Sequence, residues 1–369
     1  MIDLFREMGF APLSCVWELT LRCNLNCRHC GSRAGKSRGE ELSREELLRV
    51  ADELMALGNQ RVTLSGGEPL LNEHWPDLAR HLSEGGVAIN MISNGYAFGD
   101  REAKQCVDAG LSNVGFSLDG DERTHTLIRR RPDSYRRVLE ALDACARVSL
   151  PTTVVTHINN ANRDQLAELP RTLLDHGVSA WQLQLGFDAG NLSDHPELLL
   201  AEETIEQIVP EVVRMKQELA GKLRIDPADD MGYYTEEEPI LRQEDTLSGC
   251  WLGCRAGLQV VGIEANGNVK GCLSMQRPEF VEGNLREESL ETIWTKEGNF
   301  AYTRGFTLDQ LSGFCRQCRY AQYCRGGCSW NAYLQGGKTG RYENHYCLYR
   351  RYAMSGRADE GCLSLPESP

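Results

Sequence analysis

Six strand-like stretches alternate with helical patterns through the first half of the chain, and this alternation constrains the fold more than any other feature. The strand candidates are 14–20, 61–64, 87–92, 113–118, 152–157 and 180–185. Helical periodicity occupies the intervals at 43–57, 75–84, 101–109, 134–148 and 163–176. Repeated strand–helix units predict an α/β fold with a parallel sheet and right-handed crossovers. Periodicity does not separate an open sheet from a barrel, but in both folds ligands collect at the carboxyl ends of the strands.

Three closely spaced cysteines follow the first strand candidate. Cys23, Cys27 and Cys30 lie in the run C-N-L-N-C-R-H-C. Three thiolates can hold three irons of a 4Fe–4S cluster and leave the fourth iron open to a ligand, whereas a structural metal site closes its coordination shell. Because short cysteine spacings are common in metal sites, this spacing alone also allows a zinc knuckle.

Polar and glycine-rich loops follow the next three strand candidates. Gly66, Gly67 and Glu68 come directly after the second strand. Two glycines allow a backbone to approach a ligand closely, and a glutamate accepts hydrogen bonds from an ammonium group. The third and fourth strands are followed by further polar candidates, namely Ser93, Asn94, Ser117 and Asp119. Taken singly, each of these residues also suits an ordinary strand-to-helix loop.

The C-x3-C-x2-C spacing followed by the Gly-Gly-Glu turn resembles the signature of the radical S-adenosylmethionine (SAM) superfamily. The resemblance implies a partial (β/α)6 barrel. In that family the open iron binds SAM, and one electron cleaves SAM to methionine and a 5′-deoxyadenosyl radical. The implied cluster ligands are Cys23, Cys27 and Cys30. The implied SAM contacts are Gly66, Gly67, Glu68, Ser93, Asn94, Ser117 and Asp119, with Arg129 and either Gln182 or Gln184 as further candidates. His29 stands where an aromatic ring often packs on adenine in this family, and an imidazole can still stack.

Eight more cysteines occur in the C-terminal third: Cys250, Cys254, Cys272, Cys315, Cys318, Cys324, Cys328 and Cys347. Their spacing alone fits two structural zincs as well as two iron–sulfur clusters. Their order, however, closely resembles the SPASM extension of radical SAM enzymes. The resemblance implies two auxiliary 4Fe–4S clusters and therefore three clusters in all. The first would be held by Cys250, Cys254, Cys272 and Cys328, and the second by Cys315, Cys318, Cys324 and Cys347.

Four cysteines remain outside these sets. Cys15, Cys106 and Cys145 lie in strand or helix patterns and are expected to be packing residues. Cys362 lies in a polar C-terminal segment. The predicted divisions are a radical SAM partial barrel at 1–225, an acidic bridging linker at 226–249, a SPASM domain at 250–350 and a mobile tail at 351–369. Tyr233 and Tyr234 in the linker face either the active site or the solvent.

Composition narrows the class of partner and the compartment. The formal net charge of −13, without a basic stripe, argues against nucleic acid as the main partner. No stretch reaches the roughly 20 apolar residues of a membrane-spanning helix, and the first residues lack the pattern of a signal peptide. Fifteen cysteines in such a chain favour metal binding over disulfides. We expect a cytoplasmic, oxygen-sensitive protein.

The resemblance also implies a class of reaction. SPASM enzymes mostly modify ribosomally made peptides or proteins by crosslinking, oxidation, decarboxylation or epimerisation. The chain looks most like the mycofactocin and pyrroloquinoline quinone maturases and the haem-modifying relatives. Sulfatase-maturing enzymes carry an aspartate that acts as a base directly after the cysteine that matches Cys272. This chain has Leu273 there, which argues against formylglycine formation. Reductive cleavage of SAM implies an electron donor such as a flavodoxin or ferredoxin.

The short segment before the first cysteine motif leaves the substrate open. Only 22 residues precede Cys23, too few for the winged-helix module that grips leader peptides in many maturases. Either a separate protein presents the peptide, or the substrate is a tetrapyrrole or another small metabolite. The third alternative is a zinc-stabilised binding protein without radical chemistry. It would require the Gly-Gly-Glu turn and all three cysteine sets to be coincidental.

Overall fold

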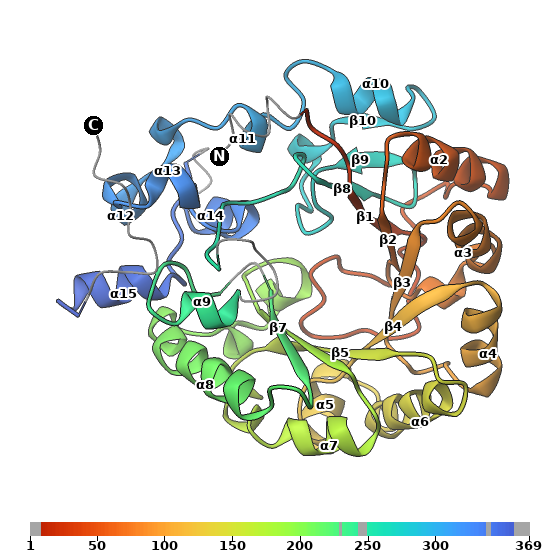
Figure 1. Cartoon of the computed structure of the whole chain (residues 1–369), viewed down its shortest axis with the longest axis horizontal. Helices are drawn as coiled ribbons and strands as arrows, with labels where there is room; N and C mark the ends of the chain where they lie inside the picture. Colours follow the sequence, from red (N-terminus) through yellow and green to blue (C-terminus); the bar gives the residue numbers. More distant parts are fainter. Residues whose placement is uncertain (1–8, 229–230, 243–248, 337–340, 358–369) are drawn as a thin grey trace.

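A curved, mostly parallel sheet organises the whole molecule (Figure 1). The computed structural model describes residues 9–228, 231–242, 249–336 and 341–357. Within these residues the sheet has ten strands in the order β10-β9-β8-β1-β2-β3-β4-β5-β6-β7. This order confirms the α/β class and the parallel core that the strand–helix repeats predict.

The six predicted strands are all present and pair in parallel with their sequence neighbours. They are β1 (Ser14–Glu18), β2 (Arg61–Ser65), β3 (Ala88–Ser93), β4 (Leu111–Ser117), β5 (Thr152–Ile158) and β6 (Ala180–Leu185). A seventh parallel strand, β7 (Arg224–Pro227), pairs with β6 and was not predicted. It lies at the edge of the sheet, where a proline is tolerated because its missing N–H removes no ladder bond.

The C-terminal segment extends the same sheet at its other edge. β8 (Val260–Ile263) pairs in parallel with β1, and β9 (Asn268–Lys270) and β10 (Gly283–Asn284) continue it antiparallel. The segment predicted as the SPASM domain therefore contributes three strands to the sheet of the barrel. The carboxyl end of β1, where the three-cysteine loop begins, lies between strands from both parts of the chain.

Helices cover the outer side of the curved sheet (Figure 1). They are α2 (Arg44–Ala56), α3 (Trp75–Glu84), α4 (Asp100–Asp108), α5 (Glu122–Arg129), α6 (Ser134–Arg147), α7 (Leu169–Asp175) and α8 (Ile205–Glu218). At α2, Ser43 and Glu46 form a reciprocal capping box. The helix predicted at 163–176 is divided, because Pro170 has no N–H with which to continue a preceding turn.

Alternate strand positions separate two faces of the sheet. One set packs beneath the helices and is fully buried, as at Trp17, Leu64, Phe116 and Trp181. The other set points to the inner side and is only half-buried through most of the sheet. The three cysteines expected to be packing residues are buried as predicted, at Cys15, Cys106 and Cys145.

Short helices make up the remaining C-terminal segment, and short 3-10 turns occur in both parts of the chain. The helices are α9 (Glu238–Leu241), α10 (Leu290–Thr295), α11 (Ala301–Arg304), α12 (Gly313–Gln317), α13 (Ala321–Cys324), α14 (Ser329–Gln335) and α15 (Leu348–Met354). The 3-10 turns are η1 (Pro69–Leu71), η2 (Arg163–Gln165), η3 (Gly190–Asp194), η4 (Pro196–Leu198), η5 (Glu202–Thr204), η6 (Pro278–Phe280) and η7 (Leu308–Gln310). None of the helices in the described part of the chain has the length and apolar composition needed to cross a membrane.

Ion pairs join α15 to the barrel. Arg350 contacts Glu202 at 2.9 Å, and Arg351 contacts Glu206 at 2.9 Å. The first residues of the segment predicted as a mobile tail, 351–354, therefore belong to helix α15, which packs against α8. Residues 358–369, including Cys362, lie outside the described residues, as do the first eight residues.

Candidate active site

The three-cysteine loop is packed tightly against the Gly-Gly-Glu turn. The N–H of Gly67 donates to the carbonyl of Thr20 at 2.8 Å, and the N–H of Glu68 donates to the carbonyl of Arg22 at 2.9 Å. A Cβ atom at Gly66 or Gly67 would collide with the carbonyl oxygens of Thr20 or Arg22. The two glycines are therefore required by the close crossing of two loops, and their approach to a ligand stays a prediction.

Each of the three thiols lies beside an N–H donor. Cys23 Sγ is 3.5 Å from the N–H of Leu25, and Cys30 Sγ is 3.3 Å from the N–H of Ala34. Cys27 Sγ is 3.7 Å from Arg129 Nη1. Donors aimed at sulfur favour the thiolate, which is the form that binds iron.

Burial works against ionisation of these thiols when no metal is bound. Burial, together with the negative charges of Glu68, Cys27 and Cys30, raises the pKa of Cys23 to about 11. A bound cation would hold the three thiols as thiolates. The donor set thus fits the cluster that the cysteine spacing implies.

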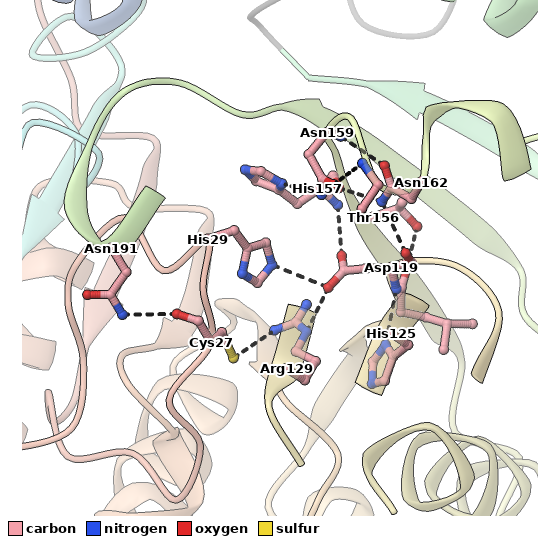
Figure 2. Close-up of polar contacts among 12 residues, drawn as sticks. Cys27, His29, Asp119, His125, Arg129, Thr156, His157, Asn159, Asn162 and Asn191 are labelled. Carbon is pink, nitrogen blue, oxygen red and sulfur yellow. Dashed lines mark hydrogen bonds and ion pairs between the residues drawn. The ribbon is translucent and has the colours of Figure 1, made fainter. Parts of the chain in front are cut away.

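A buried ion pair supports Cys27 from the fourth strand (Figure 2). Asp119, which follows β4, has no solvent exposure and contacts Arg129 Nε at 2.7 Å and His29 Nε2 at 3.3 Å. Burial alone would raise the pKa of Asp119, but the positive Arg129 and the contact with His29 hold that pKa well below its ordinary value. Since Arg129 also reaches Cys27 Sγ, the carboxylate fixes a positive charge beside one cluster ligand.

Two further histidines complete this polar group. His125 Nδ1 accepts from the N–H of Asp119 at 3.2 Å, and the ring of His157 meets that of His29 edge-on at 4.5 Å. Burial lowers the pKa of both His125 and His157 to about 3, so both rings are neutral at physiological pH. Neither ring was singled out from the sequence, because no motif surrounds these residues.

Asn191 in η3 holds the cysteine loop from the opposite side (Figure 2). Its Nδ2 donates to the carbonyl of Cys27 at 2.9 Å, and its main-chain N–H donates to the carbonyl of Cys30 at 2.8 Å. A side chain at Gly190 would collide with the carbonyls of Cys30 and Gly31. The sequence carries no signal for this contact, because η3 comes 160 or so residues after the loop it supports and its pattern is an ordinary turn.

The Gly-Gly-Glu turn presents its glutamate to the third strand. Glu68 is buried and accepts hydrogen bonds from Ser93 Oγ at 2.9 Å and from the N–H of Asn94 at 2.8 Å. Burial nevertheless raises the pKa of Glu68 to about 7. The predicted residues Glu68, Ser93 and Asn94 are thus brought together, and an ammonium group is the charge that would best stabilise the carboxylate there.

The remaining SAM candidates lie on the inner face. Ser117 ends β4, and Gln184 lies on β6 opposite His157 of β5. Both side chains are half-buried. Among the described residues, neither contacts Glu68 or the three cysteines through a hydrogen bond.

One set of C-terminal cysteines lines a single cavity. Its walls include all four predicted ligands of the second auxiliary cluster, Cys315, Cys318, Cys324 and Cys347. Main-chain N–H groups lie 3.4 Å from the sulfurs of Cys315, Cys318 and Cys347. Four thiols with aimed donors around one cavity fit a four-thiolate cluster.

The four cysteines predicted for the first auxiliary cluster do not line this cavity. Cys254 and Cys272 lie near the hydroxyl of Tyr302, and the N–H of Cys328 donates to Tyr233 Oη at 3.2 Å. Cys250 is disulfide-bonded, so a role as a cluster ligand requires its thiol to be freed. The cavity thus brings together the four cysteines predicted for the second auxiliary cluster, and both auxiliary clusters stay predictions.

The two linker tyrosines face the cysteine cavity. Tyr233 and Tyr234 are both fully buried and line the cavity of the second set. The ring of Tyr234 stacks on Tyr320 at 4.3 Å, and its hydroxyl donates to the carbonyl of Trp251. Exposure to solvent, one of the two sequence-based alternatives, is therefore wrong.

The sheet, the three-cysteine loop and the Glu68 turn define a radical SAM enzyme. The profile of the Radical SAM superfamily matches residues 17–173, and that of the SPASM iron–sulfur cluster-binding domain matches residues 254–319. This chain belongs to the radical SAM superfamily and carries a SPASM domain. The family's cofactors are SAM and 4Fe–4S clusters, and the zinc-stabilised binding protein is thereby excluded as an alternative.

Named relatives fall into two groups. The chain is 26% identical to the AdoMet-dependent heme synthase of Methanosarcina barkeri (strain Fusaro / DSM 804), over 93% of this chain and 98% of that one. It is 24% identical to the PqqA peptide cyclase of Bradyrhizobium diazoefficiens, over 88% and 83%. Among solved structures, Streptococcus suis SuiB bound to precursor peptide SuiA has a TM-score of 0.73 at 15% identity, covering 93% of this chain and 77% of that one. The likeness to SuiB shows the fold.

Proposed function

We propose that this enzyme uses SAM-derived radical chemistry to modify a side chain of a ribosomally made peptide or protein. The observation that carries the proposal is the clamped cysteine loop, whose three sulfurs each face a donor; three thiolates leave the fourth iron of a 4Fe–4S cluster open to a ligand. When bound, the cluster and SAM supply the 5′-deoxyadenosyl radical that abstracts a hydrogen atom from the substrate.

The chain's own residues bind and orient the reactants. Cys23, Cys27 and Cys30 hold the cluster, and Arg129 with Asp119 fixes Cys27. Glu68 accepts the SAM ammonium, and Ser93 and Asn94 hold that carboxylate in place. Further SAM contacts in the proposal are the backbone of Gly66 and Gly67 and the side chains of Ser117 and Gln184.

Two auxiliary clusters bring the proposed number to three. We assign one of them to Cys315, Cys318, Cys324 and Cys347, which line one cavity. Cys250, Cys254, Cys272 and Cys328 form the other once the metal draws them together. The auxiliary clusters pass electrons to or from the substrate site, with a flavodoxin or ferredoxin as the external donor. Because these reductants and the clusters themselves need a reducing compartment, we place the enzyme in the cytoplasm.

A peptide substrate is favoured by two comparisons. The named PqqA peptide cyclases act on a peptide, and SuiB is bound to its precursor peptide in the solved structure. A separate leader-binding protein would present the peptide to the enzyme. The second candidate is a tetrapyrrole, and it is favoured by the nearly end-to-end match to the heme synthase.

Anaerobic iron and sulfide quantitation with EPR spectroscopy tests the proposal. We expect about twelve irons per chain and one reduced signal that changes when SAM is added. Replacing Cys27 with alanine should abolish 5′-deoxyadenosine formation under dithionite, while Cys15→Ala, at a buried cysteine outside the motif, should preserve it. Cleavage of SAM by Cys27→Ala would refute the assignment of the cluster.

A substrate screen separates the two candidate reactions. A covalently altered peptide, detected by mass spectrometry only with SAM and reductant, would support the proposal. A tight iron coproporphyrin complex with a shifted Soret band, together with decarboxylation of its side chains, would establish the tetrapyrrole reaction instead.

A further inference from the structure

One buried arginine contacts the chain segments of both auxiliary cysteine sets. Arg325 directly follows Cys324 of the second set, and only 7% of its surface is exposed. Its Nη2 donates hydrogen bonds to the carbonyl of Leu252 at 3.2 Å and to that of Cys254, a cysteine of the first set, at 3.4 Å. The positive charge of Arg325 therefore lies where the two sets approach each other.

The loop of the first set fits closely around this guanidinium. Gly253 has a φ of +87°, in the left-handed region that favours glycine, and a Cβ atom there would collide with Arg325 Nε and Nη2. Residues 252–254 thus pack directly against the charged end of the Arg325 side chain. The contact is between the loop and the charge itself, and not between the loop and the apolar stem.

The charge of Arg325 has no carboxylate to balance it. In the part of the chain that the structure describes, Arg325 forms no ion pair with Asp or Glu, and its Nη1 is buried without a hydrogen-bond partner. Burial lowers the pKa of the guanidinium, and the groups that counteract burial are Cys254, Cys324 and Tyr234. Because an unpaired charge is costly in a protein interior, this cation requires an anion.

The other buried arginines differ from Arg325 in this respect. Three arginines are buried among the described residues, namely Arg129, Arg242 and Arg325. Arg129 contacts Asp119 at 2.7 Å, and Arg242 contacts Glu238 at 3.4 Å. The arginine without a carboxylate partner is thus the one beside the auxiliary cysteines.

The backbone gives no reason for an arginine at this position. Arg325 follows α13 with φ 54° and ψ 33°, a left-handed conformation that is unfavourable for residues with a Cβ atom. Glycine is the usual residue in this conformation at the end of a helix. The next two residues, Gly326 and Gly327, also have positive φ. The reason for an arginine here therefore lies in its side chain.

A 4Fe–4S cluster held by four thiolates is an anion that suits this cation. Such a cluster carries a net negative charge, and its one-electron reduction adds another. A fixed positive charge stabilises the reduced cluster more than the oxidised one, and it acts more strongly in a protein interior than in water. A buried, unpaired guanidinium should thus raise the reduction potential of each cluster beside it.

We propose that Arg325 raises the reduction potentials of both auxiliary clusters and so favours them as electron acceptors. This inference rests on the proposed function, because it requires the two auxiliary clusters. It assigns Arg325 an electrostatic role that is separate from the binding of iron.

A redox titration of the reconstituted holoenzyme, followed by EPR spectroscopy, tests this role. The auxiliary signals are those that SAM does not change. Arg325→Gln removes the charge and keeps a side-chain donor for the carbonyls of residues 252–254, whereas Arg325→Lys keeps the charge. We expect Arg325→Gln to lower the equilibrium constant for reduction of the auxiliary clusters at least about tenfold, or about 59 mV for one electron. Arg325→Lys should stay within about twofold of the wild type.

Two controls accompany the titration. Arg316 lies beside Cys315 on α12, but its side chain is 51% exposed, and it pairs with Asp309 at 3.3 Å. Because water screens an exposed charge, Arg316→Gln should change the same equilibrium constant by less than about twofold. The signal that responds to SAM is an internal control, since Arg129 is the arginine beside its cysteines. Its potential should be equal in all variants.

Each result supports or overturns the inference. Equal auxiliary potentials in Arg325→Gln and the wild type would overturn it. An equal fall in Arg325→Gln and Arg325→Lys, or loss of auxiliary iron from Arg325→Lys, would also overturn it, because the shape of the guanidinium and not its charge would then matter. If Arg325→Gln loses its auxiliary iron while Arg325→Lys keeps its clusters at wild-type potentials, the charge is needed and the inference stands.

Iron content separates this inference from the proposed function. About twelve irons in the wild type, with potentials that do not depend on residue 325, would overturn the inference and leave the proposed function standing. About four irons, all in the signal that responds to SAM, would refute the two auxiliary clusters of the proposed function, and the inference would fall with them.

Discussion

The two cysteine regions of this enzyme are built in different ways. The three-cysteine loop is held from three directions, by Asn94 of the third strand loop, Arg129 of α5 and Asn191 of η3. In the C-terminal region, Cys315 and Cys324 lie on α12 and α13, and Cys318 and Cys328 cap α12 and α14, which are all helices of four to seven residues. Helices this short have little stability of their own.

The three-cysteine loop and the C-terminal cysteines therefore differ in what holds their thiols in place. The barrel positions the first three thiols before any metal arrives, because the donors come from a sheet and helices with a large buried core. In the C-terminal region, one set of four cysteines lines a cavity that is bordered by short helices. There the free energy of metal binding supplies part of the free energy of folding.

The largest expected effect concerns the ion pair that supports Cys27. Arg129→Met leaves Asp119 buried without its main partner and should lower the free energy of unfolding by about 3–5 kcal/mol. Urea denaturation under anaerobic conditions measures the change. Arg80, an exposed arginine 3.7 Å from Asp77, provides the control, because Arg80→Met should cost less than about 1 kcal/mol. Equal costs at the two sites would show that the loop is not clamped by this pair.

Removal of iron should separate the two regions directly. After anaerobic chelation, we expect the amides of α12 to α14 to exchange hydrogen about 100-fold faster, while β4 and β5 keep their protection. Hydrogen exchange followed by mass spectrometry on the holo and apo proteins makes the comparison. Equal acceleration in both regions would mean that the barrel also depends on its cluster for folding.

The raised pKa of Glu68 predicts that the affinity of the barrel site for SAM depends on pH. Its pKa of about 7 means that the carboxyl is largely neutral at pH 6 and largely ionised at pH 7.5. SAM should therefore bind roughly five- to tenfold more tightly at pH 7.5 than at pH 6, measured by anaerobic EPR titration. Glu68→Gln should bind weakly at both pH values, and an unchanged pH dependence in this variant would assign the titration to another group.

The raised pKa of Glu68 affects stability in the opposite direction: SAM affinity rises with pH, whereas the free energy of unfolding falls. Because the folded pKa of Glu68 lies above its ordinary value of 4.5, its contribution to stability is present at low pH and is lost as the pH rises through about 7. In the SAM-free protein, unfolding should thus become easier over that range, and Glu68→Gln should remove the trend.

The smallest expected effect on stability comes from replacing a packing cysteine, and iron content distinguishes such a cysteine from a cluster ligand. Cys145 is buried between helix and sheet, so Cys145→Ala should lower the free energy of unfolding by about 1 kcal/mol and leave the iron content unchanged. Cys324→Ala, at the cysteine cavity, should remove about four irons. Iron analysis of the two reconstituted variants checks the pair, and equal iron contents would contradict the second auxiliary site.

Local patterns in the sequence predicted most of the fold. The strands alternate with helices as the periodicity indicates, and Ser43 caps α2 as its pattern predicts. In the barrel, β7 escaped prediction because it has four residues and ends in proline, and α5 because its eight residues are mostly polar. The short strands β8 to β10 and helices α9 to α15 were not predicted either. Short elements are stabilised by their neighbours rather than by their own composition, so their residues carry little signal.

The cofactor chemistry was also determined by the sequence, because the spacing of cysteines and the Gly-Gly-Glu turn are local in the chain. The tertiary structure decided what surrounds them. It placed Asn191 against Cys27, 164 residues away, and turned Tyr233 and Tyr234 toward the cysteine cavity. Such contacts depend on the register and curvature of the whole sheet, which no single segment of the chain encodes.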